Sequence, residues 1–376
     1  MGDKPDRDLI SNLPQSIIES ILTCLPIGDA IRTSCLSRKW RYKWTTLTHL
    51  VFDEKCVAQS GDQVVVTKSL INFITRALFL HQGPIHKFQV CTSYLQSCPD
   101  IDQWILFLSR NGIKELVLEL GEEVLVAPEA IESLISSCPL LETLSLAYFD
   151  SLALNIRAPN LKYLCLEGEF KDISLENTPL LVDLSVALYM TDENAENSEQ
   201  SSNCKFIKFL GGIPRLERLI GHIYFTKYLS IGKDPGVLPI TYNHLKIIEL
   251  YQVSFEDMKE ILVVLRLITN SPNLKELQLS GSSLTSMESP DLDFWEKEGP
   301  SDCTFHKLKV VKMTDMSGLP HEMEFIKFLL RKSPVLEIMS IMPCVFVTME
   351  SRLIIVTELL SFTRASPKAG IVFIQD

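Results

Sequence analysis

Several features that would indicate a secreted or membrane protein are missing from this sequence. No C-x-x-C pair occurs among the ten cysteines, which are scattered and often flanked by apolar residues. This spacing argues against a disulfide framework or a zinc site and favours reduced thiols in an intracellular protein of the nucleus or cytoplasm. The charged N-terminal residues contain no signal-peptide core, and no apolar run is long enough to span a membrane.

Paired catalytic or metal-binding groups are also scarce. The seven histidines lie singly, and none belongs to an H-E-x-x-H motif. A D-L-D triplet at Asp291 to Asp293 lies in an acidic segment that lacks the α/β pattern of a metal-using transferase. We therefore predict a protein that is not an enzyme and that binds no metal and no cofactor.

Positive charge is in deficit, because 36 Lys and Arg residues oppose 47 Asp and Glu residues, for a net charge of −11. Such a chain is repelled by nucleic acids and anionic membranes unless a local patch outweighs the whole. One candidate patch surrounds Trp40 and consists of Arg38, Lys39, Arg41 and Lys43. Through residue 50, however, seven basic residues face five acidic ones. That bias is weaker than is typical of a nucleic-acid module, so nucleic-acid binding remains only a rival hypothesis.

What is present begins with an apolar helical stripe in the first fifty residues. Apolar side chains recur at steps of four from Leu13 through Ile17 and Ile21 to Leu25, with Ile18 and Leu22 alongside. Pro14 suits the first helical turn, and Pro26 ends the helix.

Two further helices are expected after this one. Asp29 can cap a second helix and Ser37 a third, which would carry Trp40 and Trp44 on one face. Three short helices bury too little surface to be stable alone, so their apolar side chains require a partner. That partner is the rest of the chain, another protein, or both.

Residues 13–44, LPQSIIESILTCLPIGDAIRTSCLSRKWRYKW, resemble an F-box. The landmarks are Leu13-Pro14, Ile21-Leu22, Leu25-Pro26, Ser34, Ser37-Arg38, Trp40-Arg41 and Trp44. The resemblance implies binding to a Skp-type adaptor and, through it, to a cullin and a RING subunit. The adaptor-contacting residues that it implies are Leu13, Pro14, Ile17, Ile18, Leu22, Leu25, Pro26, Ile31, Leu36 and Trp44. The alternative is an unrelated helical cap on the repeats that follow.

The remainder of the chain repeats an L-x-x-L-x-L pattern. Three units, CPLLETLSL, APNLKYLCL and TPLLVDLSV, begin at Cys138, Ala158 and Thr178, exactly spaced by 20 residues. Eight more units flank them, with first residues at Leu47, Ile85, Ile113, Leu216, Leu245, Leu274, Leu308 and Leu336. In the unit at Leu216, Gly221 stands in the third apolar position.

This repeat resembles that of plant leucine-rich-repeat F-box proteins and predicts an α/β solenoid of parallel strands with outer helices. Residues 255–272, 67–79 and 128–139 have helical spacing, whereas the 20-residue units have room only for a loop or a single turn. The asparagine or cysteine usual three residues after the last leucine is nearly always absent. Polar residues between the leucines should face the concave side and bind a target: Thr143, Ser145, Tyr163, Cys165, Asp183, Ser185, Glu249, Glu276 and Gln278.

The C-terminal part, HEMEFIKFLLRKSPVLEIMSI followed by FTRASPKAGIVF, resembles the FBD region that closes many plant F-box proteins. We expect it to cap the end of the core, and a separate binding role is the alternative. The predicted domains are an F-box of three helices at 5–52, a leucine-rich-repeat solenoid at 53–302 and an FBD-like cap at 303–376.

The function that these resemblances imply is substrate recognition in a Skp–cullin–F-box ubiquitin ligase. The F-box would dock on the adaptor while the repeats hold an unknown target protein for ubiquitination and proteasomal degradation. The alternative is a repeat scaffold or inhibitor without ligase activity.

Overall fold

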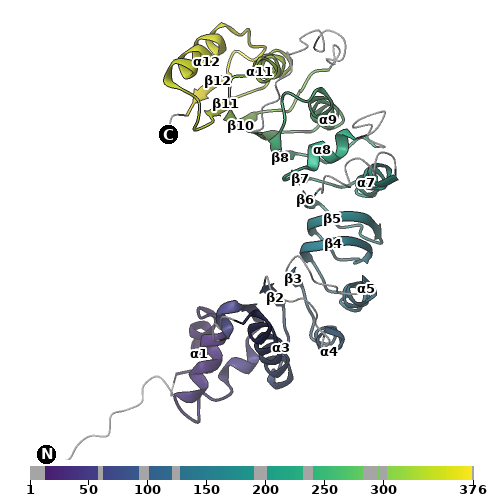
Figure 1. Cartoon of the computed structure of the whole chain (residues 1–376), viewed down its shortest axis with the longest axis vertical. Helices are drawn as coiled ribbons and strands as arrows, with labels where there is room; N and C mark the ends of the chain where they lie inside the picture. Colours follow the sequence, from purple (N-terminus) through teal and green to yellow (C-terminus); the bar gives the residue numbers. More distant parts are fainter. Residues whose placement is uncertain are drawn as a thin grey trace, which may run out of the picture. The chain divides into compact units, whose positions relative to one another are not determined.

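A computed structural model describes residues 13–57, 62–92, 101–120, 128–189, 201–231, 240–282, 295 and 303–374. The chain forms two compact units, which are described separately. The first comprises Met1–Leu161 with Glu176–Thr178, and the second comprises Lys162–Leu175 with Pro179–Asp376. Each unit is an α/β structure in which parallel strands follow chain order and helices lie on one side of them (Figure 1).

The first unit begins with short helices and continues into the repeats. Its helices are α1 (Gln15–Thr23), α2 (Ile27–Arg32), α3 (Gln63–Leu80), α4 (Ile101–Leu108) and α5 (Pro128–Ser137), with 3₁₀ helices η1 (Thr33–Cys35), η2 (Lys43–Thr46) and η3 (Glu54–Cys56). Its strands are β1 (His49–Asp53), β2 (Lys87–Thr92), β3 (Glu115–Leu120) and β4 (Thr143–Arg157). The apolar residues stack in register, with Leu50 opposite Phe88, Phe88 opposite Leu116 and Leu116 opposite Leu144.

The second unit continues the same architecture. Its strands are β5 (Tyr163–Glu176), β6 (Asp183–Leu188), β7 (Arg218–Gly221), β8 (Ile247–Val253), β9 (Glu276–Gly281), β10 (Val310–Met316), β11 (Ile338–Pro343) and β12 (Gly370–Phe373). Its helices are α7 (Ser201–Gly211), α8 (Phe225–Ser230), α9 (Met258–Thr269), α11 (Pro320–Lys332) and α12 (Met349–Ser361). One apolar ladder runs through Leu164, Leu184, Leu219, Ile248, Leu277, Val311, Met339 and Ile371.

The predicted repeat is confirmed at each of its eleven positions. Every apolar residue that the pattern assigns to the core is at most 5% exposed, from Leu47 in the first unit to Ile341 in the second. The second and third residues of each motif lie two apart on a strand and therefore point to the same face. One repeat leaves this face uncovered, so the stacking of neighbours supplies the core.

The helices expected from the longer units are present as α3, α5 and α9. In α9 the Asp257 carboxylate caps the helix by accepting a hydrogen bond from the amide of Lys259 at 2.9 Å. The apolar face of α9 buries Ile261, Val264, Leu265 and Ile268.

In the 20-residue units, the segment that connects one motif strand to the next was predicted incorrectly. Instead of ending in a loop or a turn, β4 and β5 continue as strands of 15 and 14 residues. Tyr148 and Gly168, with φ of 63° and 149°, redirect the backbone within these strands. An extended segment covers the distance with few residues, and it buries Leu154, Ile156 and Ile173 where a longer unit would place a helix.

The third N-terminal helix is not an α-helix. Residues 38–42 form turns, and η2 follows them. The hydroxyl of Ser34 donates to the Arg41 carbonyl at 2.8 Å, and the Thr45 amide donates to Tyr42 instead. The i to i+4 hydrogen bond from Thr45 to Arg41 is thereby replaced, which favours the tighter 3₁₀ geometry.

Gly221 in β7 explains the irregular repeat that starts at Leu216. A Cβ atom at this position would lie 2.4 Å and 2.6 Å from ring atoms of Phe225 and 2.8 Å from the Leu250 side chain. Phe225, the first residue of α8, is fully buried. Its ring occupies the space that the third apolar residue fills in other repeats, so the strand needs glycine for this close approach.

Restoring the repeat pattern at this position should therefore weaken the protein. We expect Gly221→Ala to lower the free energy of unfolding by about 1–3 kcal/mol, because the added carbon overpacks the core. Urea unfolding followed by circular dichroism measures the loss. The matched control is Gly370→Ala in β12, where the nearest atom to an added Cβ is the Glu337 oxygen at 3.7 Å. Equal stability of both variants would contradict this explanation.

Buried glutamates satisfy loop amides in the second unit. Glu322 of α11 is 2% exposed and accepts hydrogen bonds from the amides of Ser317, Gly318 and Leu319 at 3.0, 2.7 and 3.0 Å. At the corresponding third position of α9, Glu260 accepts from the Thr226 hydroxyl at 2.6 Å and the Ser254 amide at 3.3 Å. These carboxylates order the loops in repeats where the usual asparagine or cysteine is missing.

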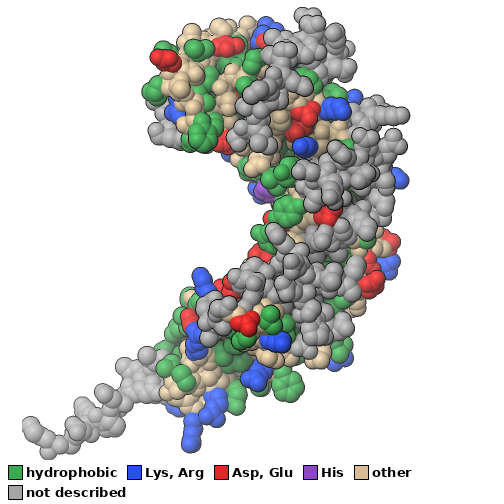
Figure 2. All heavy atoms as spheres, in the orientation of Figure 1, with side chains coloured by type: hydrophobic (Ala, Val, Ile, Leu, Met, Phe, Trp, Pro, Cys, Tyr) green, Lys and Arg blue, Asp and Glu red, His purple; other side chains and the backbone are tan. Residues whose placement is uncertain are grey.

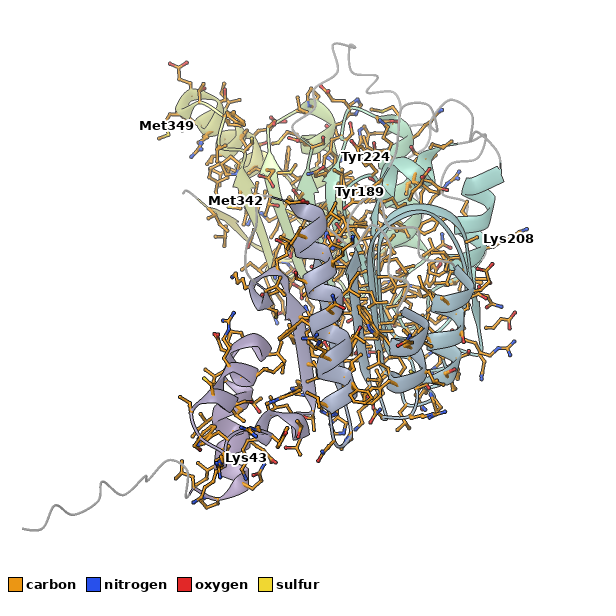
Figure 3. All side chains as sticks on the ribbon, turned by 60° about the horizontal axis from the view of Figure 1, so that its bottom comes forward. Lys43, Tyr189, Lys208, Tyr224, Met342 and Met349 are labelled. Atoms are coloured by element: carbon orange, nitrogen blue, oxygen red, sulfur yellow. The ribbon has the colours of Figure 1, made fainter. Side chains whose placement is uncertain are left out.

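The C-terminal end differs from a simple polar cap. β12 pairs with β11, and α12 turns Ile355 and Leu359 inward. However, Met349, Leu353, Ile354 and Leu360 of α12 are each at least 66% exposed, and Phe346 before it is 84% exposed. Met349 is labelled at the start of this helix in Figure 3. A solenoid terminus normally presents a polar outer face, and this one is apolar.

Candidate functional site

The N-terminal helix α1 divides its apolar residues between two faces. Ile18 and Leu22 are 1% and 0% exposed and pack inside the first unit. Ile17 and Ile21 are 46% and 41% exposed on the outer side of α1, and Leu25, which is 38% exposed, follows at the same step of four just after the helix ends at Thr23. An exposed apolar row on a helix is a typical protein-binding feature. We call these three residues the outer row.

The other residues predicted to contact an adaptor fall into three groups. Pro14, Pro26 and Leu36 are exposed, Leu36 at 69%. Leu13 and Ile31 are half-buried. Trp44 is 3% exposed, so it belongs with Ile18 and Leu22 in the core rather than on the surface.

Ile21 was not among the predicted contact residues, although the structure exposes it. The four-residue spacing that it shares with Ile17 and Leu25 was the signal that would have identified it. Sequence periodicity places all of these residues on one broad stripe, and it does not say which edge of the stripe a neighbouring element covers.

Contacts within the first unit hold α1 in this orientation. Lys43 of η2, which is labelled in Figure 3, donates a hydrogen bond to Gln15, and Thr46 donates to Glu19 at 3.1 Å. On the next helix, Gly28 approaches Cys56 so closely that an added Cβ would lie 3.2 Å from the Cys56 Cα atom. The N-terminal helices therefore pack against the first repeat through α2 and leave the outer row uncovered by the described residues.

The basic residues around Trp40 lie at the surface. Trp40 itself is 4% exposed, whereas Arg38 and Arg41 are exposed. Figure 2 shows hydrophobic and Lys or Arg side chains side by side on the N-terminal helices. The tryptophans thus serve packing, and the cations flank an apolar surface rather than forming a separate basic groove.

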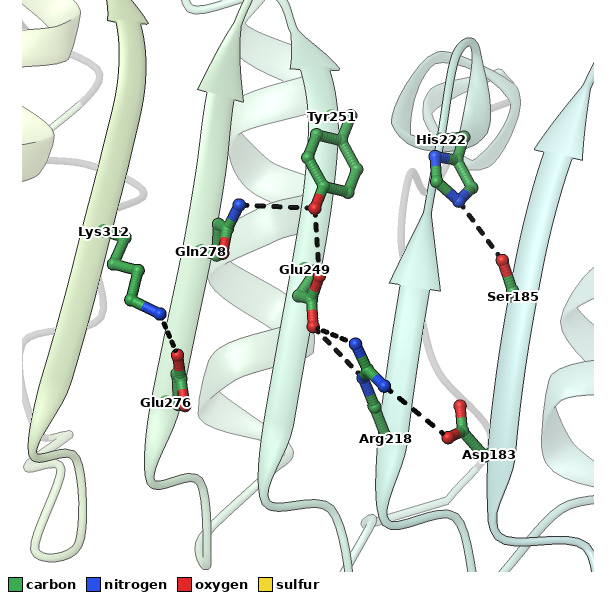
Figure 4. A network of polar contacts seen from close by, with 9 residues as sticks. All are labelled: Asp183, Ser185, Arg218, His222, Glu249, Tyr251, Glu276, Gln278 and Lys312. Atoms are coloured by element: carbon green, nitrogen blue, oxygen red, sulfur yellow. Dashed lines mark hydrogen bonds and ion pairs between the residues drawn. The ribbon is translucent and has the colours of Figure 1, made fainter. Parts of the chain in front are cut away.

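A second candidate surface lies in the second unit, on the strand face that alternates with the buried leucines (Figure 4). We call it the open face. Its centre is Arg218 of β7, which donates to Glu249 of β8 through Nη2 at 2.7 Å and Nε at 3.1 Å. The Nη1 atom of Arg218 also lies 3.9 Å from Asp183 of β6. One guanidinium therefore links three neighbouring strands.

The network extends across further strands. The Tyr251 hydroxyl donates to Glu249 at 2.9 Å and accepts from Gln278 at 3.3 Å, and Lys312 donates to Glu276 at 2.6 Å. His222 stacks on Tyr251 with ring centroids 5.2 Å apart and planes 8° apart. The Nε2 atom of His222 lies 3.2 Å from the Ser185 hydroxyl.

Burial and neighbouring charges tune the titratable groups on this face. Burial lowers the pKa of His222, so its imidazole is neutral at pH 7. Burial also raises the pKa of Asp183, while the positive charge of Arg218 opposes this shift. The hydrogen bond to Glu249 raises the pKa of Arg218. The face thus combines a permanent cation with carboxylates that outnumber it.

The structure brings most of the predicted target-binding residues together. Asp183, Ser185, Glu249, Glu276 and Gln278 join the network, and Tyr163 and Cys165 lie on the neighbouring strand β5, where burial raises the pKa of Tyr163 to about 12. Thr143 and Ser145 belong to β4 of the first unit.

Sequence reasoning missed Arg218, His222, Tyr251 and Lys312, which complete the open face. Strand alternation was the available signal, because Arg218 pairs in register with Asp183, and Lys312 pairs with Gln278. His222 follows directly after β7 and could not be placed from its spacing alone.

The described residues form neither a metal site nor a membrane-spanning helix. No three His, Cys, Asp or Glu side chains in the described part of the chain gather so as to hold a metal ion. None of the described helices has both the length and the hydropathy needed to cross a bilayer. The D-L-D triplet at residues 291–293 lies outside the described residues.

Comparisons with known proteins identify the domains of the chain. The F-box domain model matches residues 10–51, and the FBD model matches residues 296–341. A model described as FBD-associated F-box protein At5g56370, LRR repeats, matches residues 111–279.

Two full-length relatives come from Arabidopsis thaliana. FBD-associated F-box protein At4g10400 is 24% identical and covers 87% of this chain and 90% of its own length. F-box/FBD/LRR-repeat protein At1g13570 is 55% identical, with 100% of both chains covered. Together with the matches to all three domain types, this identity shows that the chain belongs to the family of F-box/FBD/LRR-repeat proteins.

Proposed function

We propose that this chain is the substrate-recognition subunit of a Skp–cullin–F-box ubiquitin ligase. In this proposal residues 5–52 bind the Skp-type adaptor, residues 53–302 hold a target protein, and residues 303–376 close the repeat array. F-box proteins generally act as substrate adaptors of such ligases, and the F-box match covers residues 10–51. The observation that carries the proposal is the outer row of Ile17, Ile21 and Leu25 within that match.

The outer row gives the adaptor a physical reason to bind. Full burial of one Ile or Leu side chain contributes roughly 1.5–3 kcal/mol. The three side chains of the outer row are still partly exposed, so an adaptor that covers them would gain a substantial part of this energy from each. The exposed Leu36, Pro14 and Pro26 would extend the same contact. Because apolar rows of this kind carry most of the energy of helix-in-groove contacts, they suit a stable adaptor complex.

The proposed subunit is non-catalytic and acts by proximity. Binding the adaptor with one surface and the target with another raises the effective concentration of the target near the ubiquitin donor. Adaptor, cullin and RING subunits would place the protein in the nucleus or cytoplasm.

Replacing Leu13 and Pro14 together by alanine tests the adaptor contact. We expect co-purification of a Skp-type adaptor to fall below detection, because Pro14 is exposed directly before α1 and fixes how the chain enters it. Circular dichroism and the unfolding midpoint of the repeats should stay as in the unchanged chain. Phe79→Ala is the control, because Phe79 is 84% exposed in the same unit but lies outside the F-box.

Two results would contradict the proposal. Adaptor binding that survives the double alanine change would show that the contact lies elsewhere. An unchanged, folded chain that never binds a Skp-type adaptor would favour the repeat scaffold or inhibitor instead.

A further inference from the structure

A cavity of about 480 Å³ opens on the open face of the second unit. It lies where β6, β7, β8 and β9 end, and β5 contributes its middle part. Its lining includes Glu167, Tyr189, His222, Ile223, Tyr251 and Ser280. This volume is within the range of roughly 300–1,000 Å³ that is typical of ligand sites.

The walls of the cavity combine aromatic, aliphatic and acidic groups. Tyr189 donates a hydrogen bond to one oxygen of Glu167, which leaves the second carboxylate oxygen to accept from a ligand. The stacked rings of His222 and Tyr251 form an aromatic wall, and Ala187 and Ile223 supply apolar surface.

The charges around the cavity are unbalanced toward negative. On strands β6 to β10, all of which the structure describes, Arg218 and Lys312 are the cations, and both already contact carboxylates. The carboxylates on these strands are Asp183, Glu249, Glu276 and Asp315. The last of these binds the cavity residue Ser280 at 2.7 Å, and Glu167 of β5 adds a further negative charge.

The surplus of carboxylates around the cavity disfavours an anionic ligand. A phosphate, sulfate or carboxylate ligand would need a cation that is not already paired, and these strands offer none. A cationic ligand, in contrast, would meet Glu167 directly, and Asp315 adds negative charge next to the lining residue Ser280. The aromatic faces add to this preference, because rings of tyrosine attract lysine and arginine cations.

We infer that the cavity receives a lysine or arginine side chain from an extended segment of the target protein. This inference rests on the proposed function, because it names the feature by which the target is recognised. The methylene stem would pack on Ala187 and Ile223 while the charged head contacts Glu167. Arginine should bind better than lysine, because its planar guanidinium stacks on aromatic rings and donates two parallel hydrogen bonds to a carboxylate.

The test uses the full-length chain and four pools of random heptapeptides labelled with a fluorophore. The pools carry arginine, lysine, glutamine or glutamate at the central position, and fluorescence anisotropy measures their binding. We expect the arginine and lysine pools to bind about tenfold or more tightly than the glutamine pool, which corresponds to one charge-assisted hydrogen bond. The glutamate pool should bind least.

Variants then locate the interaction. Glu167→Gln should remove most of the preference for the basic pools, and Tyr251→Ala should weaken both basic pools. Glu337→Gln is the matched control, because it removes one carboxylate that pairs with Lys309, outside the cavity. Acetylated arginine amide and spermidine serve as competitors that separate a peptide side chain from a free small cation. Direct binding of spermidine, measured by isothermal titration calorimetry, without binding of the peptides would overturn the inference of a protein ligand.

Other outcomes also decide the matter. Equal binding of the arginine and glutamine pools, or a Glu167→Gln variant that retains the full preference, would overturn the inference. Adaptor co-purification is measured on the same variants and should not change. Loss of the peptide preference with intact adaptor binding would leave the proposed function standing, whereas a chain that binds basic peptides but no adaptor would refute the proposed function alone.

Discussion

Ile21→Asp should abolish adaptor binding while the chain remains folded. Ile21 is 41% exposed in the middle of the outer row, so the change places a charge where the proposed contact is apolar. Central interface residues cost about 2 kcal/mol or more when truncated, which weakens binding by at least about thirtyfold. Surface changes away from the core usually alter stability by no more than about 0.5 kcal/mol. Titration of the purified chain with a Skp-type adaptor measures the effect.

The neighbouring residue supplies the matched contrast. Leu22 is fully buried, so Leu22→Ala should destabilise the first unit by about 2–5 kcal/mol through the cavity that it leaves. The Leu22→Ala variant should lose adaptor binding only in proportion to the fraction of molecules that unfold. Lowering the temperature should refold the variant and restore its binding. If Ile21→Asp unfolds the chain, or if it binds the adaptor normally, the division of α1 into an outer and an inner face is wrong.

Glu322→Ala should strongly lower the stability of the second unit. The carboxylate is the acceptor for three consecutive amides, Ser317, Gly318 and Leu319, and it is 2% exposed. An unsatisfied buried donor costs about 1–3 kcal/mol, so removal of the shared acceptor should cost at least about 3 kcal/mol. Hydrogen exchange at these amides and along α11 should accelerate by about a hundredfold or more.

The control for this substitution lies two residues away on the same helix. Glu324 pairs with Lys327 at 2.6 Å, but both side chains are about one-third exposed. Glu324→Ala should therefore change stability by less than about 1 kcal/mol. Unaltered exchange at Ser317 to Leu319 in Glu322→Ala would show that the loop amides do not depend on this carboxylate.

The protonation of Glu322 makes the stability of the second unit depend on pH. Burial raises the pKa of Glu322 to about 7 against an ordinary value of 4.5, although the three amides oppose the shift. The folded state therefore holds the proton more tightly than the unfolded state. Its contribution to stability is fully present below pH 4.5 and is lost as the pH rises through 7. Glu322→Gln cannot titrate, so its stability relative to the unchanged chain should improve from pH 5 to pH 8. A pH-independent difference would contradict the shifted pKa.

The repeat architecture was predictable because the signal is local and is repeated eleven times. A motif residue such as Leu116 has neighbours at the same register in the strands on either side, so each repeat reinforces the next. Prediction from local spacing failed where a repeat deviates from the common pattern. Gly221 breaks the pattern because Phe225 of a different element fills its place, and no spacing rule contains that information.

The candidate sites were less predictable than the fold. Asp183 and Glu249 were expected on the open face, but their link through Arg218 depends on three strands lying side by side. Ile18 and Ile21 looked equivalent in the sequence, yet one is buried and the other is exposed. Glu322 was not singled out, because a glutamate in the first turn of an amphipathic helix is normally solvated.

The sequence by itself determined the strand positions, their parallel register and the family, because hydrophobic spacing dictates which side chains share a face. Only the tertiary structure decided which edge of α1 stays open, how Arg218 links its carboxylates, and why Glu322 is buried. These properties depend on which elements cover each face. That coverage arises from contacts between residues far apart in the chain, which spacing along the chain does not encode.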